Sequence, residues 1–336
     1  MRAIGDSAVR THACVTVIIN PVSGAGDCEA RQASISDALS DRGYTCQFFA
    51  TAPDVEVKAT VKEAIQNGAE LILVAGGDGT VMQVIAALID TDVLLAIIPS
   101  GTGNLLALNL GIPTSILEAV EIALDGAPCA IDLARVRTRA VRAPSERSIM
   151  EKTARQSAPE NRNGDEWQYF AIMGGIGLDA HMIRDADRSM KRTWGVLAYL
   201  GAILKNLRRR ASPVSVSIDG NPPIRRRIKT VLVANMGKVI GGLAAFPNAD
   251  PADGVLDIGL IMSSSIGAWL RLLWMALCGR PHDSPSMDVF RGKHIVIRSS
   301  AVEPVELDGE ICGYTNEMTI EAMPRAVSVM LPAISD

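Results

Sequence analysis

The sequence lacks the patterns that mark disulfide-bonded, zinc-binding and secreted proteins. Its six cysteines are scattered over 336 residues, with no Cys-x-x-Cys pair and no histidines at ligand spacing. Neither a disulfide framework nor a zinc site is therefore expected. The first residues also lack the basic, apolar and small-residue succession of a signal peptide. We therefore expect a cytoplasmic protein.

Long apolar runs and an excess of basic residues are missing as well. The most apolar helical stretch, residues 266–278, contains Arg271 and is too short to cross a hydrocarbon core of about 30 Å. The formal net charge is −4, whereas binding to nucleic acid requires a basic surface. The sequence therefore predicts neither a transmembrane span nor a nucleic-acid partner. With 48% hydrophobic and 21% charged residues, the chain has the composition of a globular protein, and its length favours two domains.

The first part of the chain alternates short apolar runs with amphipathic stretches. Glycine or proline bounds the short runs, a pattern that predicts β-α-β units around a parallel sheet. The expected strands and helices are residues 15–19, 29–41, 46–49, 55–67, 71–74, 81–89 and 94–98.

This alternation of short apolar runs and amphipathic stretches ends at about Cys129. Residues 138–166 are polar and poor in periodicity, which predicts a long mobile insertion. Two helical stretches follow at 178–190 and 194–208. Alternating runs such as 214–218 and 228–234 then predict antiparallel strands, because Asp-Gly pairs of the kind that form tight turns punctuate this part of the chain.

Three glycine-rich turns each follow an apolar run and precede a helical pattern. They are residues 20–24 (NPVSG), 76–80 (GGDGT) and 99–104 (PSGTGN). Ligands of open α/β sheets bind beyond the carboxyl ends of the strands, and glycine lets backbone N–H groups approach phosphate oxygens. Chain reversal alone would explain any one of these turns, but three at corresponding positions favour a nucleotide site. Thr80 with Gln83 also fits a capping box.

Two classes of nucleotide-binding protein are excluded by absent motifs. The chain has no GxxxxGK[ST], so it is not a P-loop enzyme, and no HRD and DFG set, so it is not a protein kinase.

The GGDGT turn together with PSGTGN resembles the paired signature of the diacylglycerol, sphingosine and ceramide kinase superfamily. The resemblance continues through residues 174–180, 247–257 and 307–310, so it covers nearly the whole chain. It implies an α/β nucleotide domain at 1–134, similar to those of phosphofructokinase and NAD kinase, to which residues 322–336 are expected to return. It also implies a mainly antiparallel, β-sandwich-like lipid-binding domain at 135–321, with the active cleft between the domains.

The resemblance also assigns residues to ATP and to a metal. Asp78 is expected near the phosphates and Mg²⁺, and a second Mg²⁺ would be held by Asp250, Asp253 and the carbonyl of Val255. An ordinary turn is the alternative for that second site. The residues expected to hold ATP are Asn20, Pro21, Ser23, Gly24, Thr51, Gly76, Gly77, Asp78, Gly79, Thr80, Gly101, Thr102 and Asn104.

Asp308 and Glu310 match the catalytic acidic pair of the resembled family. One carboxylate would accept the proton of the lipid hydroxyl while the other orients it or helps to hold Mg²⁺, and we favour Glu310 as the acceptor. The alternative is a plain β-turn with two solvated acids.

The function implied is transfer of the ATP γ-phosphate to a lipid hydroxyl, most simply that of diacylglycerol, which gives phosphatidic acid. Sphingosine or ceramide kinase activity is the near alternative, because hydrocarbon-lined clefts discriminate weakly between tails. NAD kinase shares GGDGT, but the second motif of that family is missing here. A non-catalytic lipid-binding module is the third alternative, and retention of both acids speaks against it.

Three further features leave alternatives open. Residues 175–180 satisfy a dinucleotide fingerprint, but the antiparallel pattern after them disfavours a Rossmann fold. Residues 208–210 and 225–227 are arginine clusters. The first ends an apolar helical stretch and fits either solvated charge or contact with a membrane surface. We expect peripheral association with a membrane, and a homodimer stays open.

Overall fold

The computed structural model describes residues 14–24, 27–52, 56–141, 166–177, 211–239, 244–262, 267, 271, 275 and 286–333. The chain divides into unit 1, Met1–Cys129 with Val327–Asp336, and unit 2, Ala130–Ala326. Residues 142–165 of the expected insertion and the helical stretches expected at 178–190 and 194–208 lie outside the described residues.

Unit 1 is built on a parallel sheet whose central strands are apolar and buried. Its strands run in the order β14-β4-β3-β1-β2, and every pairing among them is parallel. The C-terminal end of β14 joins this sheet through Ser328 and Val329, which lie opposite Leu94 and Leu95. The bounds are β1 Cys14–Ile19, β2 Thr45–Ala50, β3 Leu71–Gly76, β4 Leu94–Pro99 and β14 Glu310–Leu331.

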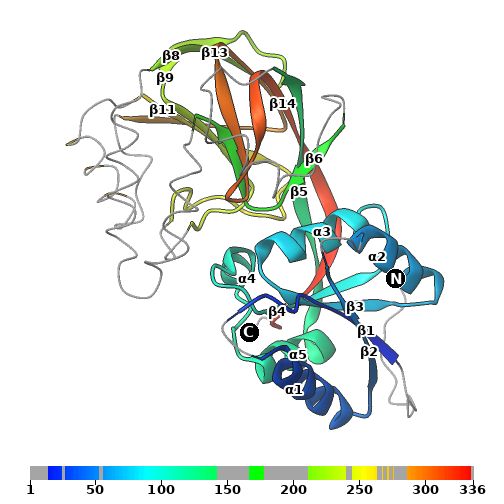
Figure 1. Cartoon of the computed structure of the whole chain (residues 1–336). Coiled ribbons are helices and arrows are strands. Elements are labelled where there is room, and N and C mark those ends of the chain that lie inside the picture. The colour runs from blue at the N-terminus through cyan, green and yellow to red at the C-terminus, as the bar shows by residue number, and fades with distance from the viewer. Residues whose placement is uncertain are drawn as a thin grey trace. The chain divides into compact units, whose positions relative to one another are not determined.

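Helices cover both faces of this sheet. In Figure 1, α1 and α5 lie on one face and α2 and α3 on the other. Helix α1 begins at an Asp27 cap and α5 at a Ser115 cap, each of which accepts a backbone N–H of the first turn. The predicted α/β fold is therefore confirmed. The helices are α1 Cys28–Ser40, α2 Val57–Gln66, α3 Asp78–Leu88, α4 Leu105–Leu110 and α5 Ile116–Asp125.

Unit 2 is an antiparallel β-sandwich, as predicted. Its strands are β5 Ala127–Ala140, β6 Gln168–Phe170, β7 Met173–Ile176, β8 Ser212–Ile218, β9 Ile224–Ile228, β10 Thr230–Ala234, β11 Leu256–Ile261, β12 Met287–Gly292, β13 His294–Leu307 and the first part of β14. They pair in the order β12-β11-β10-β7-β13-β14, while β8 lies between β13 and β9. Alternating apolar residues such as Val216, Ile258, Ile297 and Ile320 fill the core around Phe170.

Two local predictions are wrong. The insertion was expected from residue 138, but strand β5 continues to Ala140. Its last side chains are polar and still belong to the sheet, as the ion pair between Arg139 and Glu317 at 3.9 Å shows. The capping box is also wrong, because the N-cap of α3 is Gly77 and the Thr80 hydroxyl accepts the amide of Asn20 instead.

Candidate active site

The three glycine loops lie at one edge of the unit 1 sheet, since they follow the adjacent strands β1, β3 and β4. The loops touch one another at glycine. A Cβ on Gly101 would lie 2.5 Å from Cα of Gly77, and a Cβ on Gly24, whose φ is +81°, would lie 2.6 Å from the carbonyl oxygen of Ser100. Side chains at these positions would force the loops apart. The predicted nucleotide residues of the three loops are thus brought together within unit 1.

Asp78 connects the second loop to the third. Its two carboxylate oxygens accept the backbone N–H groups of Leu105 and Leu106 at 3.0 Å each, at the start of α4. Asn104, in the left-handed region at φ 45°, exchanges two hydrogen bonds of 2.8 Å with the backbone of Gly101. The predicted Mg²⁺ ligand Asp78 therefore already holds the next loop in place.

Asn20 connects the first loop to the second. Its side-chain amide donates to the hydroxyl of Thr80 at 2.8 Å, and its side-chain oxygen accepts the N–H of Val22 at 3.0 Å. Thr51 follows β2, the strand next to β1, and its N–H bonds to the carbonyl of Ile19 at 2.8 Å. The remaining predicted nucleotide residue thus also lies at this edge of the sheet.

Arg31 is a residue that the sequence reasoning missed. This side chain on α1 is only 8% exposed and donates to the carbonyl of Asn20 at 3.3 Å. Its Nη2 is buried and has no hydrogen-bond partner among the described residues. A buried cation with an unused donor beside glycine loops favours an anionic ligand there. The available signal was a lone arginine on the face that carries Ile35 and Leu39.

The Asp308-Gly309 turn of unit 2 connects β13 to β14. Both residues have positive φ, 47° and 90°, as a tight hairpin turn requires. The carboxylate of Asp308 accepts the backbone N–H groups of Ala171, Ile172 and Met173, each at 2.9 Å. Asp308 therefore holds the segment between β6 and β7 against the turn.

Glu310 differs from Asp308 in having no such partners. Its side chain is exposed and forms no hydrogen bond or ion pair with any other residue that the structure describes. The predicted acidic pair thus divides into one carboxylate anchored within the fold and one that is free to meet a substrate.

Burial shifts the pKa values of two neighbours of this turn. Glu306 is 4% exposed, and its carboxyl accepts the N–H of Gly309. Burial, with a smaller contribution from the charge of Asp308, raises the pKa of Glu306 to about 8. Burial and the surrounding carboxylates also raise the pKa of Cys312 to about 12, so this thiol is not ionised at neutral pH.

The glycine run at 174–177 serves packing in the sheet. Strand β7 is antiparallel to both β10 and β13, whereas a dinucleotide fingerprint requires a parallel β-α-β unit. A Cβ on Gly175 would lie 2.0 Å from the carbonyl oxygen of Val231, and one on Gly174 would lie 2.7 Å from Leu307. The sequence already disfavoured a Rossmann fold, and the antiparallel pairing of β7 excludes one here.

The turn expected to hold the second Mg²⁺ contains two carboxylates. That of Asp250 accepts the N–H of Ala252 at 3.0 Å, and that of Asp253 accepts the N–H of Val255 at 2.9 Å and pairs with Arg291. These oxygens are of the type that Mg²⁺ prefers, but Arg291 already neutralises one of them. The described residues contain no cluster of three or more His, Cys, Asp or Glu side chains at metal-binding distances. The second metal site therefore stays a prediction.

Two buried polar residues around these turns were also missed from the sequence. Asp132 accepts the N–H of Gly254 at 2.5 Å and that of Arg325 at 2.7 Å. The amide of Asn235 donates to the carbonyls of Asp132 and Ala171, at 2.8 Å each. The signal for Asp132 was a single acid within the apolar run 129–136, a position where charge requires partners.

Comparison with known protein families accounts for both units. The model of the diacylglycerol kinase catalytic domain matches residues 14–136, which include all three glycine loops. The model of the YegS C-terminal NAD kinase β-sandwich-like domain matches residues 173–331, which include the Asp308 turn. The chain belongs to the diacylglycerol kinase catalytic-domain family. It is accordingly an ATP-dependent lipid kinase.

Relatives of this lipid kinase match it along nearly their whole length. A diacylglycerol kinase of Mycobacterium tuberculosis is 29% identical, with 95% of each chain covered. A diacylglycerol kinase of Bacillus subtilis is 26% identical over 88% of this chain and 89% of its own. A crystal structure of a putative diacylglycerol kinase from Bacillus anthracis superposes with a TM-score of 0.71 at 25% identity, covering 94% of this chain and 95% of that chain.

The structure describes only some of the sequence features that could contact a membrane. None of the described helices is long and apolar enough to span a membrane. The cluster 208–210 lies outside the described residues, whereas the cluster 225–227 forms the exposed centre of β9.

Proposed function

We propose that the lipid kinase transfers the γ-phosphate of ATP to the free hydroxyl of diacylglycerol, which yields phosphatidic acid. The observation that carries this proposal is the free, exposed carboxylate of Glu310 on a tight turn whose other acid, Asp308, is held by three backbone N–H groups. Abstraction of a hydroxyl proton requires a base that the substrate can reach, and no described residue competes for the carboxylate of Glu310. The names of the relatives from Mycobacterium tuberculosis and Bacillus subtilis support diacylglycerol as the acceptor.

The glycine loops of unit 1 would bind the phosphates of ATP. Gly77, Gly101 and Gly24 keep three loop backbones in contact, so N–H groups of the loops and of the start of α3 can approach phosphate oxygens. The guanidinium of Arg31 adds a buried positive charge behind the first loop. Phosphoryl transfer depends chiefly on positioning and on compensation of phosphate charge, and these loops provide both.

In the proposed reaction the lipid hydroxyl oxygen attacks the γ-phosphorus. A bond forms between these two atoms as the bond from the γ-phosphorus to the bridging oxygen of ADP breaks. Glu310 takes the hydroxyl proton, so charge does not accumulate on the attacking oxygen. Asp308 acts as a positioning residue, because its carboxylate is used to anchor residues 171–173 to the turn.

Mg²⁺ would supply compensation of phosphate charge when it is bound with ATP. Asp78 would hold this Mg²⁺, because it lies within the glycine loop at residues 76–80. Its carboxylate can accept further contacts beyond the two N–H groups that it already binds. We assign the second Mg²⁺ to Asp250, Asp253 and the carbonyl of Val255, as the sequence predicts.

We propose that the enzyme acts at a membrane surface as a peripheral protein, because the proposed substrate is a membrane lipid. Sphingosine, ceramide and NAD remain the competing acceptors, and a homodimer is compatible with the proposal. A kinase assay with labelled ATP distinguishes the acceptors, using diacylglycerol, monoacylglycerol, sphingosine, ceramide and NAD in parallel. Diacylglycerol should give the highest kcat/KM. Labelling of NAD without labelling of any lipid would overturn the proposal, and so would the absence of lipid labelling above a protein-free control.

A further inference from the structure

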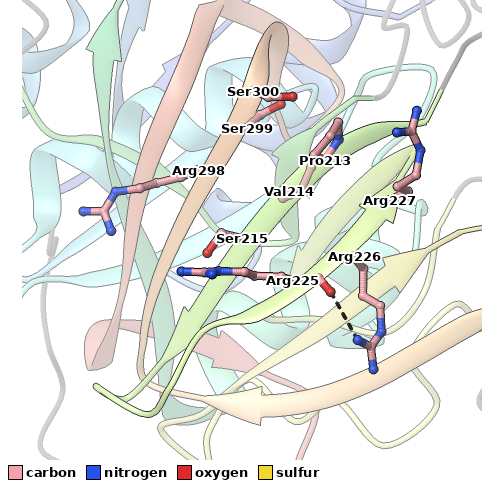
Figure 2. A pocket seen from close by; sticks show the side chains of 9 residues that line it. All are labelled: Pro213, Val214, Ser215, Arg225, Arg226, Arg227, Arg298, Ser299 and Ser300. Carbon is pink, nitrogen blue, oxygen red and sulfur yellow. Dashed lines mark hydrogen bonds between the residues drawn. The ribbon is translucent and has the colours of Figure 1, made fainter.

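An arginine-lined hollow lies on the outer face of the β8–β9 hairpin in unit 2. Its volume is about 500 Å³, and most of the nine residues that line it are arginine or serine, as Figure 2 shows. The volume falls within the range of about 300–1,000 Å³ that is usual for ligand sites. The exposed wall of the hollow is mostly apolar, and the guanidinium and hydroxyl groups of its lining residues suit an anion.

The sheet register explains why the arginines gather there. Val214, Val216 and Ile218 of β8 point into the core, so Ser215 points outward. Ser215 lies opposite Arg225 of β9 on one side and opposite Arg298 of β13 on the other. The three side chains therefore form a row on one face of the sheet.

The charges of this row are unequally compensated. Arg298 pairs with Glu317 of β14 at 2.9 Å. Arg227 donates to the carbonyl of Ala211 at 3.0 Å, and neither Arg227 nor Arg225 forms an ion pair within the described part of the chain. Both of these arginines are exposed. The face therefore carries at least two positive charges that no neighbouring acid in the described residues neutralises.

We propose that this arginine face docks the enzyme on the anionic phospholipid headgroups of a membrane surface. The whole chain is acidic, with a formal net charge of −4, so a local basic face is needed for approach to an anionic bilayer. The planar guanidinium binds phosphate oxygens with two parallel hydrogen bonds. Pro213, an exposed residue of the lining, adds apolar surface that can contact the glycerol and acyl carbons of a phospholipid, which inorganic phosphate lacks. The proposal rests on the proposed function only in that the substrate resides in a membrane.

Charge on β9 also has a purely structural explanation. Among the described strands β9 pairs only with β8 and is therefore an edge, where charged side chains prevent pairing with a second chain. That role predicts self-association on neutralisation of the arginines, with no effect on lipid binding. Vesicle binding distinguishes the two roles.

The test measures sedimentation of the full chain with vesicles, without ATP or diacylglycerol. One set of vesicles is phosphatidylcholine alone, and in the other part of it is replaced by phosphatidylglycerol. The wild type should bind only the anionic set. Arg225→Gln with Arg227→Gln should weaken this binding about 30-fold, since each basic residue near an anionic surface contributes a factor of about five.

Two matched variants serve as controls. Lys58→Gln with Lys62→Gln removes the same charge from exposed positions of α2 and should leave vesicle binding unchanged. Arg225→Lys with Arg227→Lys keeps the charge and should retain most of the binding. Turnover of a water-soluble, short-chain diacylglycerol should be equal in all variants, which separates this surface from the catalytic proposal.

Three results would overturn the docking surface. The first is equal vesicle binding by the wild type and the Arg225→Gln, Arg227→Gln variant, with or without aggregation of the variant. The second is an equal loss in the α2 control, which would mean that only total charge matters. The third is saturable, arginine-dependent binding of inorganic phosphate in calorimetry by a wild type that does not sediment with anionic vesicles.

Discussion

The carboxylate of Asp78 accepts the backbone N–H of Leu105 at 3.0 Å, and so joins the loop after β3 to the helix after β4. An acid at the start of a helix compensates the partial positive charge of its N–H groups. Asp78 thereby joins two of the three glycine loops that we propose bind ATP.

Asp78→Asn should weaken ATP binding and lower the melting temperature. An amide has one acceptor oxygen, so one of the N–H groups of Leu105 and Leu106 would face an N–H donor, at a cost of about 1–3 kcal/mol. Calorimetric titration with ATP and thermal melts measure the two effects. Asp92→Asn, at an exposed site of the same unit, is the control and should change neither. Unaltered ATP affinity in Asp78→Asn would remove Asp78 from the nucleotide site.

Asp308 and Asp219 offer a matched comparison. Both occupy Asp-Gly turns at positive φ, and each carboxylate accepts backbone N–H groups, those of Lys293 and His294 in the case of Asp219. Asp308→Asn and Asp219→Asn should each lower stability by about 1–3 kcal/mol. Only Asp308→Asn should also lower kcat for lipid phosphorylation, because only that turn carries Glu310. Equal activity of the two variants would reduce Asp308 to a residue of the fold alone.

Glu306 should make stability depend on pH. Its folded pKa of about 8 lies above the ordinary value of 4.5, so between these values the folded state holds a proton that the unfolded state has lost. The free energy of unfolding then falls as pH rises, by up to about 1.4 kcal/mol per pH unit, and the loss is complete above pH 8.

Glu306→Gln should remove this dependence, since the amide stays neutral and its oxygen can still accept the N–H of Gly309. The melting temperature of the variant should match that of the wild type near pH 4.5 and exceed it above pH 8. Parallel pH profiles for the two proteins would mean that Glu306 is not protonated in the folded state.

How much of the site was predictable depends on the distance in sequence between its parts. The glycine loops and the Asp-Gly turns follow from local patterns, because apolar runs, glycine and turn residues act on their immediate neighbours. The partners of Asp78 lie 27 and 28 residues away, and those of Asp308 lie 135 to 137 residues away. No local pattern specifies which N–H groups a carboxylate will meet. The difference between the anchored carboxylate of Asp308 and the exposed one of Glu310 therefore required the fold.

The capping box at Thr80 and Gln83 is a local pattern that was present in the sequence but is not used in the structure. The pattern was present, but the Thr80 hydroxyl is used by Asn20, a residue 60 positions earlier. A tertiary contact replaced the local one. Buried polar residues such as Arg31 and Asn235 were missed for the same reason, since their role depends on carbonyls supplied by distant segments.

We expect the turn that contains Asp250 and Asp253 to bind a structural Mg²⁺. Asp253→Ala should lower the melting temperature and abolish its dependence on added Mg²⁺. Arg291→Gln is the informative control, because it removes the ion pair with Asp253 but none of the proposed metal ligands. That variant should melt lower yet still respond to Mg²⁺. A Mg²⁺-dependent shift that survives in Asp253→Ala would exclude the site.

The central claim is that Glu310 is the base of a lipid kinase reaction. The most direct measurement is the rate at which Glu310→Gln phosphorylates diacylglycerol at saturating ATP. The exposed side chain has no partner among the described residues, so the substitution should leave ATP affinity and the melting temperature unchanged. The rate should fall by a factor on the order of 10² to 10⁴, as is usual when a positioned base is removed. A rate within a few-fold of the wild type would contradict the account.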